Sequence, residues 1–229
     1  MIHAAAGSSD VVFPNGHIMM DCDPSGTLLP ERQREDGLPM ELLDFYAHPS
    51  ARKANLSIAE VAALRIYSTA AFKRINAPLR DPERRAKGEA HPLPLAVHLI
   101  KEAVGKLRAI DALGETARRG LDLYRGMSNV LVADRFIEEG GTELAPMSTT
   151  ASIGTALEYA ASSNGLVLRL RTRSSMERGA DIRFVSAFPA EKEYLFPPLV
   201  YLQPTKRRSQ EVLDVLGTSV LVIDVEPRF

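Results

Sequence analysis

The segment EKEYLFPP, residues 191–198, places two carboxylates directly before an apolar run. Alternate residues of a β-strand point to the same side, so Glu191 and Glu193 are predicted to face one site while Lys192 points away. Like charges side by side repel, and an apolar wall beneath them adds a cost of desolvation. Such a pair suits chemistry through an oxocarbenium-like sugar cation, which negative charge stabilises as a glycosidic bond breaks. The alternative is a solvated acidic turn that precedes a strand.

Short β-like runs surround this segment through the second half of the chain. From Gly120 onward they are separated by Gly, Ser, Pro and charged turns, and they read LDLYR, TELAPM, GLVLRL, DIRFV, EYLFP, VYLQP and SVLVIDVE. One helix is predicted among them, over residues 153–161, with Ser152 as its N-cap and with Leu157 and Ala160 facing inward.

The first half of the chain is predicted to be helical. A short helix over residues 40–47 would turn Leu42, Leu43 and Phe45 inward and end before Pro49, because the residue before a proline resists helical angles.

A capping box at Ser57 and Glu60 begins the next helix, whose apolar positions recur as far as Pro78. A further helix is predicted over residues 93–113, with Gly114 as its stop. Helices followed by strands indicate an α+β domain.

The basic run between these helices, KRINAPLRDPERRAKG at residues 73–88, is interpreted as a solvated helix end and loop. A phosphate-binding surface is the alternative, but no aromatic side chain interrupts the run to stack on a base. Residues 1–36 show no apolar period and are predicted to form a flexible N-terminal extension, either mobile or loosely docked on the domain.

Composition excludes several classes of protein. The chain has 229 residues, 45% of them apolar, which fits one large soluble domain. Its 28 basic and 29 acidic residues give no global field for nucleic acid, and its one cysteine excludes an internal disulfide framework. No apolar run reaches the roughly 18 residues of a membrane span. A cytoplasmic location is the default, with secretion as the open alternative.

Common catalytic signatures are missing. The sequence contains no G-x-x-x-x-G-K-[ST] loop and no G-x-G-x-x-G turn, and its five histidines show no H-E-x-x-H spacing. The segment Gly126-Met127-Ser128-Asn129-Val130 lacks the second glycine of a hydrolase nucleophile elbow. These absences disfavour kinases, standard dehydrogenases, serine hydrolases and zinc peptidases.

Two other motifs precede the carboxylate pair. LYRG, at residues 123–126, places Arg125 at the end of an apolar strand, where a guanidinium can clamp a phosphate or carboxylate, although a surface ion pair is the commoner role. Gly126 lets another group approach the backbone. MSTTAS, at residues 147–152, offers hydroxyls that hold ribose oxygens or orient a carboxylate, or that simply cap a helix.

In this order LYRG, MSTT and EKEYLFPP resemble the R-S-E class of mono-ADP-ribosyltransferases, the arginine-specific type. The resemblance covers roughly residues 56–229. It implies an α+β fold in which a helical subdomain precedes a split, mainly antiparallel β-sandwich around an NAD cleft. The expected organisation is an extension at 1–36 and a domain at 37–229, helical over 37–119 and β-rich and catalytic over 120–229.

The resemblance also implies roles for residues of the first two motifs. Arg125, followed by Gly126, would hold a phosphate or ribose of NAD. Ser148 would support the nicotinamide ribose and position the catalytic carboxylate, with Thr149 and Thr150 beside it. The sequence reads STT where many relatives read STS, so the third position keeps its hydroxyl and gains a methyl group.

For the third motif, the resemblance assigns Glu193 to the ribose 2′-hydroxyl and the oxocarbenium ion, and Glu191 to the acceptor guanidinium. The loop 186–190 would recognise the acceptor, with Phe188 either a contact or a core anchor. Phe184 or Tyr159 would line the nicotinamide pocket.

The expected reaction is transfer of ADP-ribose from NAD to an arginine of a protein acceptor, with release of nicotinamide. NAD is the co-substrate, no metal is required, and the oligomeric state and acceptor stay open. An NAD glycohydrolase of the same fold and a catalytically silent binding module are the alternatives.

Overall fold

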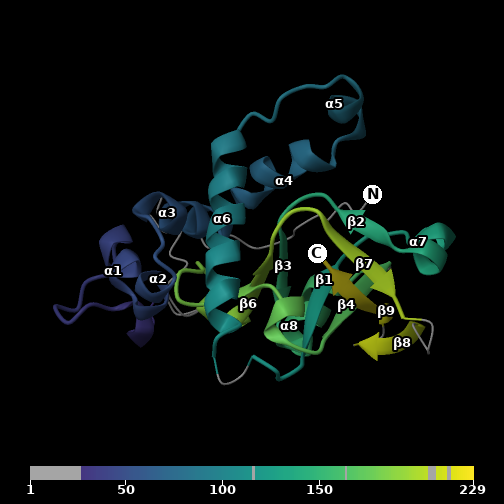
Figure 1. The fold of residues 1–229 in the computed structure, drawn as a ribbon. Coiled ribbons are helices and arrows are strands. Elements are labelled where there is room, and N and C mark those ends of the chain that lie inside the picture. The colour runs from purple at the N-terminus through teal and green to yellow at the C-terminus, as the bar shows by residue number, and fades with distance from the viewer. Residues whose placement is uncertain (1–26, 115–116, 163, 206–209, 216–217) are drawn as a thin grey trace.

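The computed structural model describes residues 27–229 except 115–116, 163, 206–209 and 216–217. Its helical half and its sheet-rich half follow one another in the chain (Figure 1). The helices are α1 Leu42–Ala47, α2 Pro49–Lys53, α3 Ile58–Tyr67, α4 Phe72–Arg80, α5 Pro82–Ala86, α6 Pro94–Asp111, α7 Asp134–Glu139 and α8 Ile153–Ala160. The strands are β1 Leu121–Met127, β2 Gly141–Glu143, β3 Met147–Thr150, β4 Gly165–Thr172, β5 Ala180–Asp181, β6 Glu193–Phe196, β7 Val200–Pro204, β8 Gln210–Val215 and β9 Thr218–Arg228. Short 3₁₀ turns are η1 Pro30–Arg32, η2 Ser175–Glu177 and η3 Pro189–Glu191.

The described strands pair in the order β2-β7-β9-β4-β1-β3-β6-β5, with β8 added to β9. Among the strands that the structure describes, only β4 and β9 pair in parallel, so the sheet is mainly antiparallel, and the predicted α+β fold is confirmed. β8 has no counterpart among the predicted strands.

The sheet is split between β1 and β3. These strands share the single register pair Tyr124↔Thr150, whereas β1 pairs with β4 along its whole length. One part, β3-β6-β5, packs with the helical half through a core that includes Leu195 and Ile182, and the other part has its own core around Leu168. The split therefore lies where LYRG, MSTT and the start of β6 meet.

Helix α1 corrects one prediction. Phe45 is buried, but Leu42 and Leu43 are 38% and 62% exposed. Met40 and Tyr46, rather than the two leucines, pack beside Phe45 in the helical core. A helix of six residues has room for only one contact face, and the sequence pattern does not tell which face that is.

The capping box is confirmed, because Ser57 and Glu60 each bond the other's backbone amide at the start of α3. The long apolar run behind it is not one helix. It breaks at residues 68–71 between α3 and α4, and Pro78 lies inside α4 rather than after it. The helix predicted over 93–113 is confirmed as α6.

The basic run is not wholly solvated. Arg80 donates through Nε and Nη2 to the two oxygens of Glu143, both at 3.0 Å, and Glu143 is buried. This two-pronged pair ties α4 to β2, so Arg80 has a structural role that the charge pattern alone did not indicate.

Residues 27–36, predicted as the end of the extension, include a docked side chain. Arg32 is 2% exposed and donates to the carbonyls of Phe184 at 2.5 Å, Arg183 at 2.7 Å and Ser186 at 2.8 Å. This part of the chain therefore packs on the domain, while residues 1–26 lie outside the described residues. The division at residue 36 stays a prediction.

Helix α8 begins as predicted, with the Ser152 hydroxyl accepting from the amide of Thr155 at 3.3 Å. Its inner face packs against β1 and β4 with almost no space. A Cβ on Gly126 would lie 1.8 Å from the carbonyl oxygen of Ala156, and one on Gly165 would lie 2.2 Å from that of Ala160. The group that approaches the backbone of Gly126 is thus the helix itself.

Replacing Gly126 by Ala is expected to lower the free energy of unfolding by about 3 kcal/mol, because helix backbone must move to admit the methyl group. Chemical denaturation of both proteins measures the loss. Gly105→Ala is the matched control: a Cβ there meets nothing within 4 Å, so this change in the middle of α6 should stabilise by about 0.5–1 kcal/mol. Equal effects of the two substitutions would contradict this packing.

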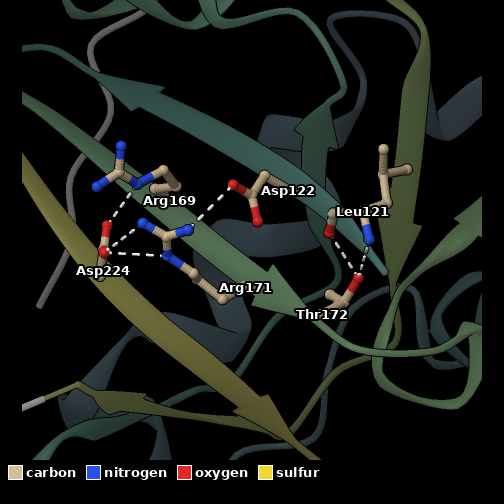
Figure 2. Close-up of polar contacts among 6 residues, drawn as sticks. All are labelled: Leu121, Asp122, Arg169, Arg171, Thr172 and Asp224. Atoms are coloured by element: carbon tan, nitrogen blue, oxygen red, sulfur yellow. Dashed lines mark hydrogen bonds and ion pairs between the residues drawn. The ribbon is translucent and has the colours of Figure 1, made fainter. Parts of the chain in front are cut away.

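A charge network joins side chains of β1, β4 and β9 (Figure 2). Asp224, 5% exposed, accepts from Arg169 Nε at 2.5 Å and from Arg171 Nε and Nη2 at 3.0 and 2.9 Å. Arg171 also reaches Asp122 at 3.4 Å. Burial disfavours the Asp224 charge, but the hydrogen bonds from the two arginines outweigh it and lower the pKa.

Asp224→Asn should lower the free energy of unfolding by about 2 kcal/mol at neutral pH, less than for a fully buried pair because Arg171 is half exposed. Since the folded-state pKa of Asp224 lies below its ordinary value of about 3.9, the stabilisation is complete above that value and is lost as the pH falls below it. Unfolding curves of both proteins at neutral pH and below pH ~4 test this. A difference that persists unchanged in acid would rule out the ion pairs as its source.

Candidate active site

A cavity of about 320 Å³ opens at the split in the sheet. Its walls come from the segment joining α3 to α4, from β1, from β3 with the start of α8, and from residues 188–193. All the predicted site residues line it: Arg125, Gly126, Ser148, Thr149, Thr150, Glu191 and Glu193. We call this cavity the cleft.

Arg125, Ser148 and Glu193 form a continuous hydrogen-bonded chain across the split. Arg125 Nη1 donates to the carbonyl oxygen of Ser148 at 2.8 Å, and the Ser148 hydroxyl donates to Glu193 Oε1 at 2.7 Å. Three motifs that lie far apart in the sequence thus meet at one point.

The second oxygen of Glu193 is held as firmly as the first. Oε2 accepts from the hydroxyl of Ser186 at 2.7 Å, and Glu193 is 5% exposed. Burial raises the pKa of Glu193, while the two serine hydroxyls oppose the rise by stabilising the charge. The carboxylate is therefore fixed in orientation and poorly solvated, which increases its effect on a nearby positive charge.

Ser186 was predicted only as the first residue of the acceptor loop 186–190, and its contact with Glu193 was not predicted. The run DIRFV forms a strand only as far as Asp181, and the chain then turns, with the amides of Val185 and Ser186 bonding to the carbonyl of Ile182. The carbonyl of Ser186 accepts from Arg65 as well as from Arg32. This clamped turn is what aims the Ser186 hydroxyl at Glu193.

The geometry predicted for the carboxylate pair is wrong, although both residues line the cleft. Glu191 ends η3, Lys192 takes a left-handed conformation with φ of 51°, and β6 begins only at Glu193. Glu191 and Glu193 therefore face one site because of a turn and not because of strand alternation.

Glu191 is less buried than Glu193 and has a different partner. Tyr159, in α8, donates its hydroxyl to Glu191 Oε1 at 2.6 Å. Burial raises the pKa of Glu191, the Tyr159 hydrogen bond lowers it, and the neighbouring charges of Glu193 and Glu158 raise it. Glu191 lines the cleft and is partly exposed, so an external group can reach it.

Thr149 and Thr150 use their hydroxyls on the backbone. Thr149 donates to the carbonyl of Tyr194 at 2.9 Å, and Thr150 donates to the carbonyl of Glu191 while accepting from the amide of Ser152 at 2.9 Å. They fasten β3 to the segment that carries both glutamates. Contact with a nucleotide stays a prediction for both.

Two of the three aromatic residues singled out line the cleft. Tyr159 is 45% exposed and Phe188 36% exposed, so Phe188 is not a core anchor. Phe184 is instead stacked on His48, with 4.9 Å between ring centroids, and lines a separate cavity. Of the two residues offered as alternatives for the nicotinamide pocket, Tyr159 and not Phe184 lines the cleft.

Tyr67 and Asn76 line the cleft and were not predicted. The Tyr67 hydroxyl donates to the carbonyl of Pro146 at 2.7 Å, and Asn76 Nδ2 donates to both of these oxygens. The side-chain oxygen Oδ1 of Asn76 is buried and has no partner among the described residues. The signal that the sequence offered for this role was Asn76, a polar residue next to the apolar Ile75 in α4.

Among the described residues, no group of His, Cys, Asp and Glu is arranged to hold a metal ion. None of the helices described is long and apolar enough to cross a membrane.

The family is established by sequence. Residues 48–225 match the model of the ADP-ribosyltransferase exoenzyme family, which is most of the chain. The protein therefore belongs to this family and is an NAD-dependent ADP-ribosyltransferase. The predicted family and the predicted co-substrate are confirmed. No curated protein matches the chain significantly.

Solved structures share the fold. Vis toxin from Vibrio splendidus superposes with a TM-score of 0.54 at 18% identity, over 80% of this chain and 82% of the toxin. The ADP-ribosyltransferase HopU1 of Pseudomonas syringae pv. Tomato gives 0.56 at 21% identity, over 80% and 82%. Exoenzyme S from Pseudomonas aeruginosa gives 0.51 at 19% identity, over 80% and 86%. At these identities the likeness is one of fold.

Proposed function

We propose that this protein transfers ADP-ribose from NAD to the guanidinium group of an arginine in a protein acceptor and releases nicotinamide. The observation that carries the proposal is the chain Arg125–Ser148–Glu193, which lines the same cleft as Glu191. Arg125, Ser148 and Glu193 would bind and cleave NAD. Glu191 would select the acceptor.

Arg125 is the group we assign to NAD binding. Its guanidinium is fixed by the Ser148 carbonyl, and its Nε is buried with no hydrogen-bond partner among the described residues. Burial lowers the pKa of Arg125, but a guanidinium starts so high that it stays charged at neutral pH. A cation held in this way at the cleft wall suits a phosphate of NAD.

Glu193 is the group we assign to bond cleavage. When the bond between ribose C1′ and the nicotinamide nitrogen breaks, its electron pair leaves with nicotinamide and the sugar becomes an oxocarbenium ion. A fixed carboxylate stabilises that charge more than it stabilises the ground state, because it needs no reorganisation. Ser148 and Ser186 keep both oxygens of Glu193 in place.

Glu191 is the group we assign to the acceptor. Its carboxylate matches the two-pronged geometry of a guanidinium, and Glu191 lines the cleft and is partly exposed. A guanidinium nitrogen then attacks C1′, and the proton that it loses passes by way of Glu191 to solvent. The complex of Vis toxin with agmatine, a small guanidine, supports an acceptor of this chemistry, and the complex of Exoenzyme S with carba-NAD supports the nucleotide.

The experiment is incubation of the chain with NAD labelled in its ADP-ribose part, with agmatine in one sample and cadaverine, a diamine without a guanidinium, in the other. We expect label on agmatine and none on cadaverine. Free ADP-ribose alone would favour an NAD glycohydrolase. Absence of turnover despite NAD binding would favour a silent module.

A further inference from the structure

The hydrogen bond between Tyr159 and Glu191 connects helix α8 to the residue that we assign to the acceptor. Tyr159 projects from α8, whose Ala156 and Ala160 are fully buried against the sheet. The helix backbone cannot shift toward Gly126, because a single added methyl group there would overlap the Ala156 carbonyl. The hydroxyl of Tyr159 is therefore presented to Glu191 from a rigid support.

Glu191 is held at two points. Its carbonyl accepts from the Thr150 hydroxyl, and its Oε1 accepts from Tyr159 at 2.6 Å. An ionised carboxylate has about four acceptor positions on its two oxygens. The phenol occupies one of them, so a guanidinium can still bind both oxygens while the side chain keeps one orientation.

We propose that the Tyr159 hydroxyl is a positioning group for the acceptor: it orients Glu191 toward the incoming guanidinium and takes no part in NAD cleavage. This inference rests on the proposed function and assigns a specificity-determining residue to it. Glu193 has its own two hydroxyl donors, Ser148 and Ser186, and does not depend on Tyr159.

The charges around Glu191 give the hydroxyl a second effect. Burial disfavours the charge of Glu191 and so raises its pKa. The negative charges of Glu193 on β6 and Glu158 on α8 raise this pKa further. Tyr159 is the neighbour that lowers this pKa. Removing the hydroxyl should raise the pKa, so the acid limb of the transfer rate should move to higher pH while that of NAD cleavage stays in place.

The experiment is Tyr159→Phe, which removes the hydroxyl and keeps the ring. We expect the KM for agmatine to rise about tenfold, while nicotinamide release without acceptor falls by a much smaller factor, because the ring that lines the cleft is kept. Tyr159 is 45% exposed and its ring is kept, so the unfolding temperature should change little. In a Glu191→Gln background the same substitution should have little further effect on transfer, because the two residues act as a pair.

Two outcomes would overturn the proposal. One is an unchanged KM for agmatine in Tyr159→Phe. The other is an equal fall in NAD cleavage and transfer, which would place the hydroxyl in the nucleotide site. If the proposed function itself fails, the wild-type protein gives no agmatine product at all, and this result is distinct from both.

Discussion

Replacing Glu193 by Gln is expected to lower nicotinamide release and ADP-ribose transfer together, by at least about 10²–10³-fold. The amide keeps the shape of the side chain and its contacts, since the hydroxyls of Ser148 and Ser186 can rotate to accept as well as donate. What is lost is the negative charge beside the developing oxocarbenium ion. Chromatographic measurement of nicotinamide release, with and without acceptor, checks both activities.

The control for this variant is its stability. Burial disfavours the charged form of Glu193, so a neutral amide should unfold at the same temperature as the wild type or slightly higher. A folded Glu193→Gln protein that keeps more than about a tenth of the NAD cleavage would contradict the role of the carboxylate.

Replacing Glu191 by Gln is expected to separate the two activities. Charge-assisted hydrogen bonds to a guanidinium are strong, so transfer to agmatine should fall by about 100-fold. NAD cleavage in the absence of acceptor should stay within a few-fold of the wild type, because the Arg125–Ser148–Glu193 chain does not include Glu191.

The conservative variant Glu191→Asp serves as the control for this prediction. It keeps the charge and shortens the reach, so it should retain more transfer than Glu191→Gln and respond to higher agmatine concentrations. If arginine modification by Glu191→Gln were unchanged, Glu191 would not be the acceptor residue.

Local features of the fold could be predicted because their signals are local. The Ser57 capping box and the Ser152 cap each lie within four residues of the helix that they start, and both were found. In α1 the burial of Phe45 was predicted correctly and that of Leu42 and Leu43 wrongly, because burial depends on which face meets α3, and that contact is not encoded within the six residues themselves.

The candidate site could be predicted in its residue types but not in its geometry. The order of the three motifs identified Arg125, Ser148 and Glu193, and the structure joins them. The positive φ of Lys192 has no signal in a sequence that offers no glycine or asparagine at that position, so a strand was the simpler reading of EKEY.

Supporting residues were missed because their contacts span long stretches of chain. Ser186 acquires its role from a turn clamped by Arg32 and Arg65, each more than a hundred residues away. The bond from Tyr159 to Glu191 likewise joins helix α8 to the turn η3, 32 residues further along the chain. The spacing of motifs in the sequence does not show which distant residues come into contact, whereas the topology of the folded backbone does.

The most direct test of the account is the partition of ADP-ribose between agmatine and water, measured as ADP-ribosyl-agmatine formed per nicotinamide released at saturating agmatine. The account predicts that most of the ADP-ribose goes to agmatine in the wild type and to water in Glu191→Gln, at similar rates of nicotinamide release. An equal partition in the two proteins would contradict the claim that one cleft cleaves NAD through Glu193 and selects a guanidinium through Glu191.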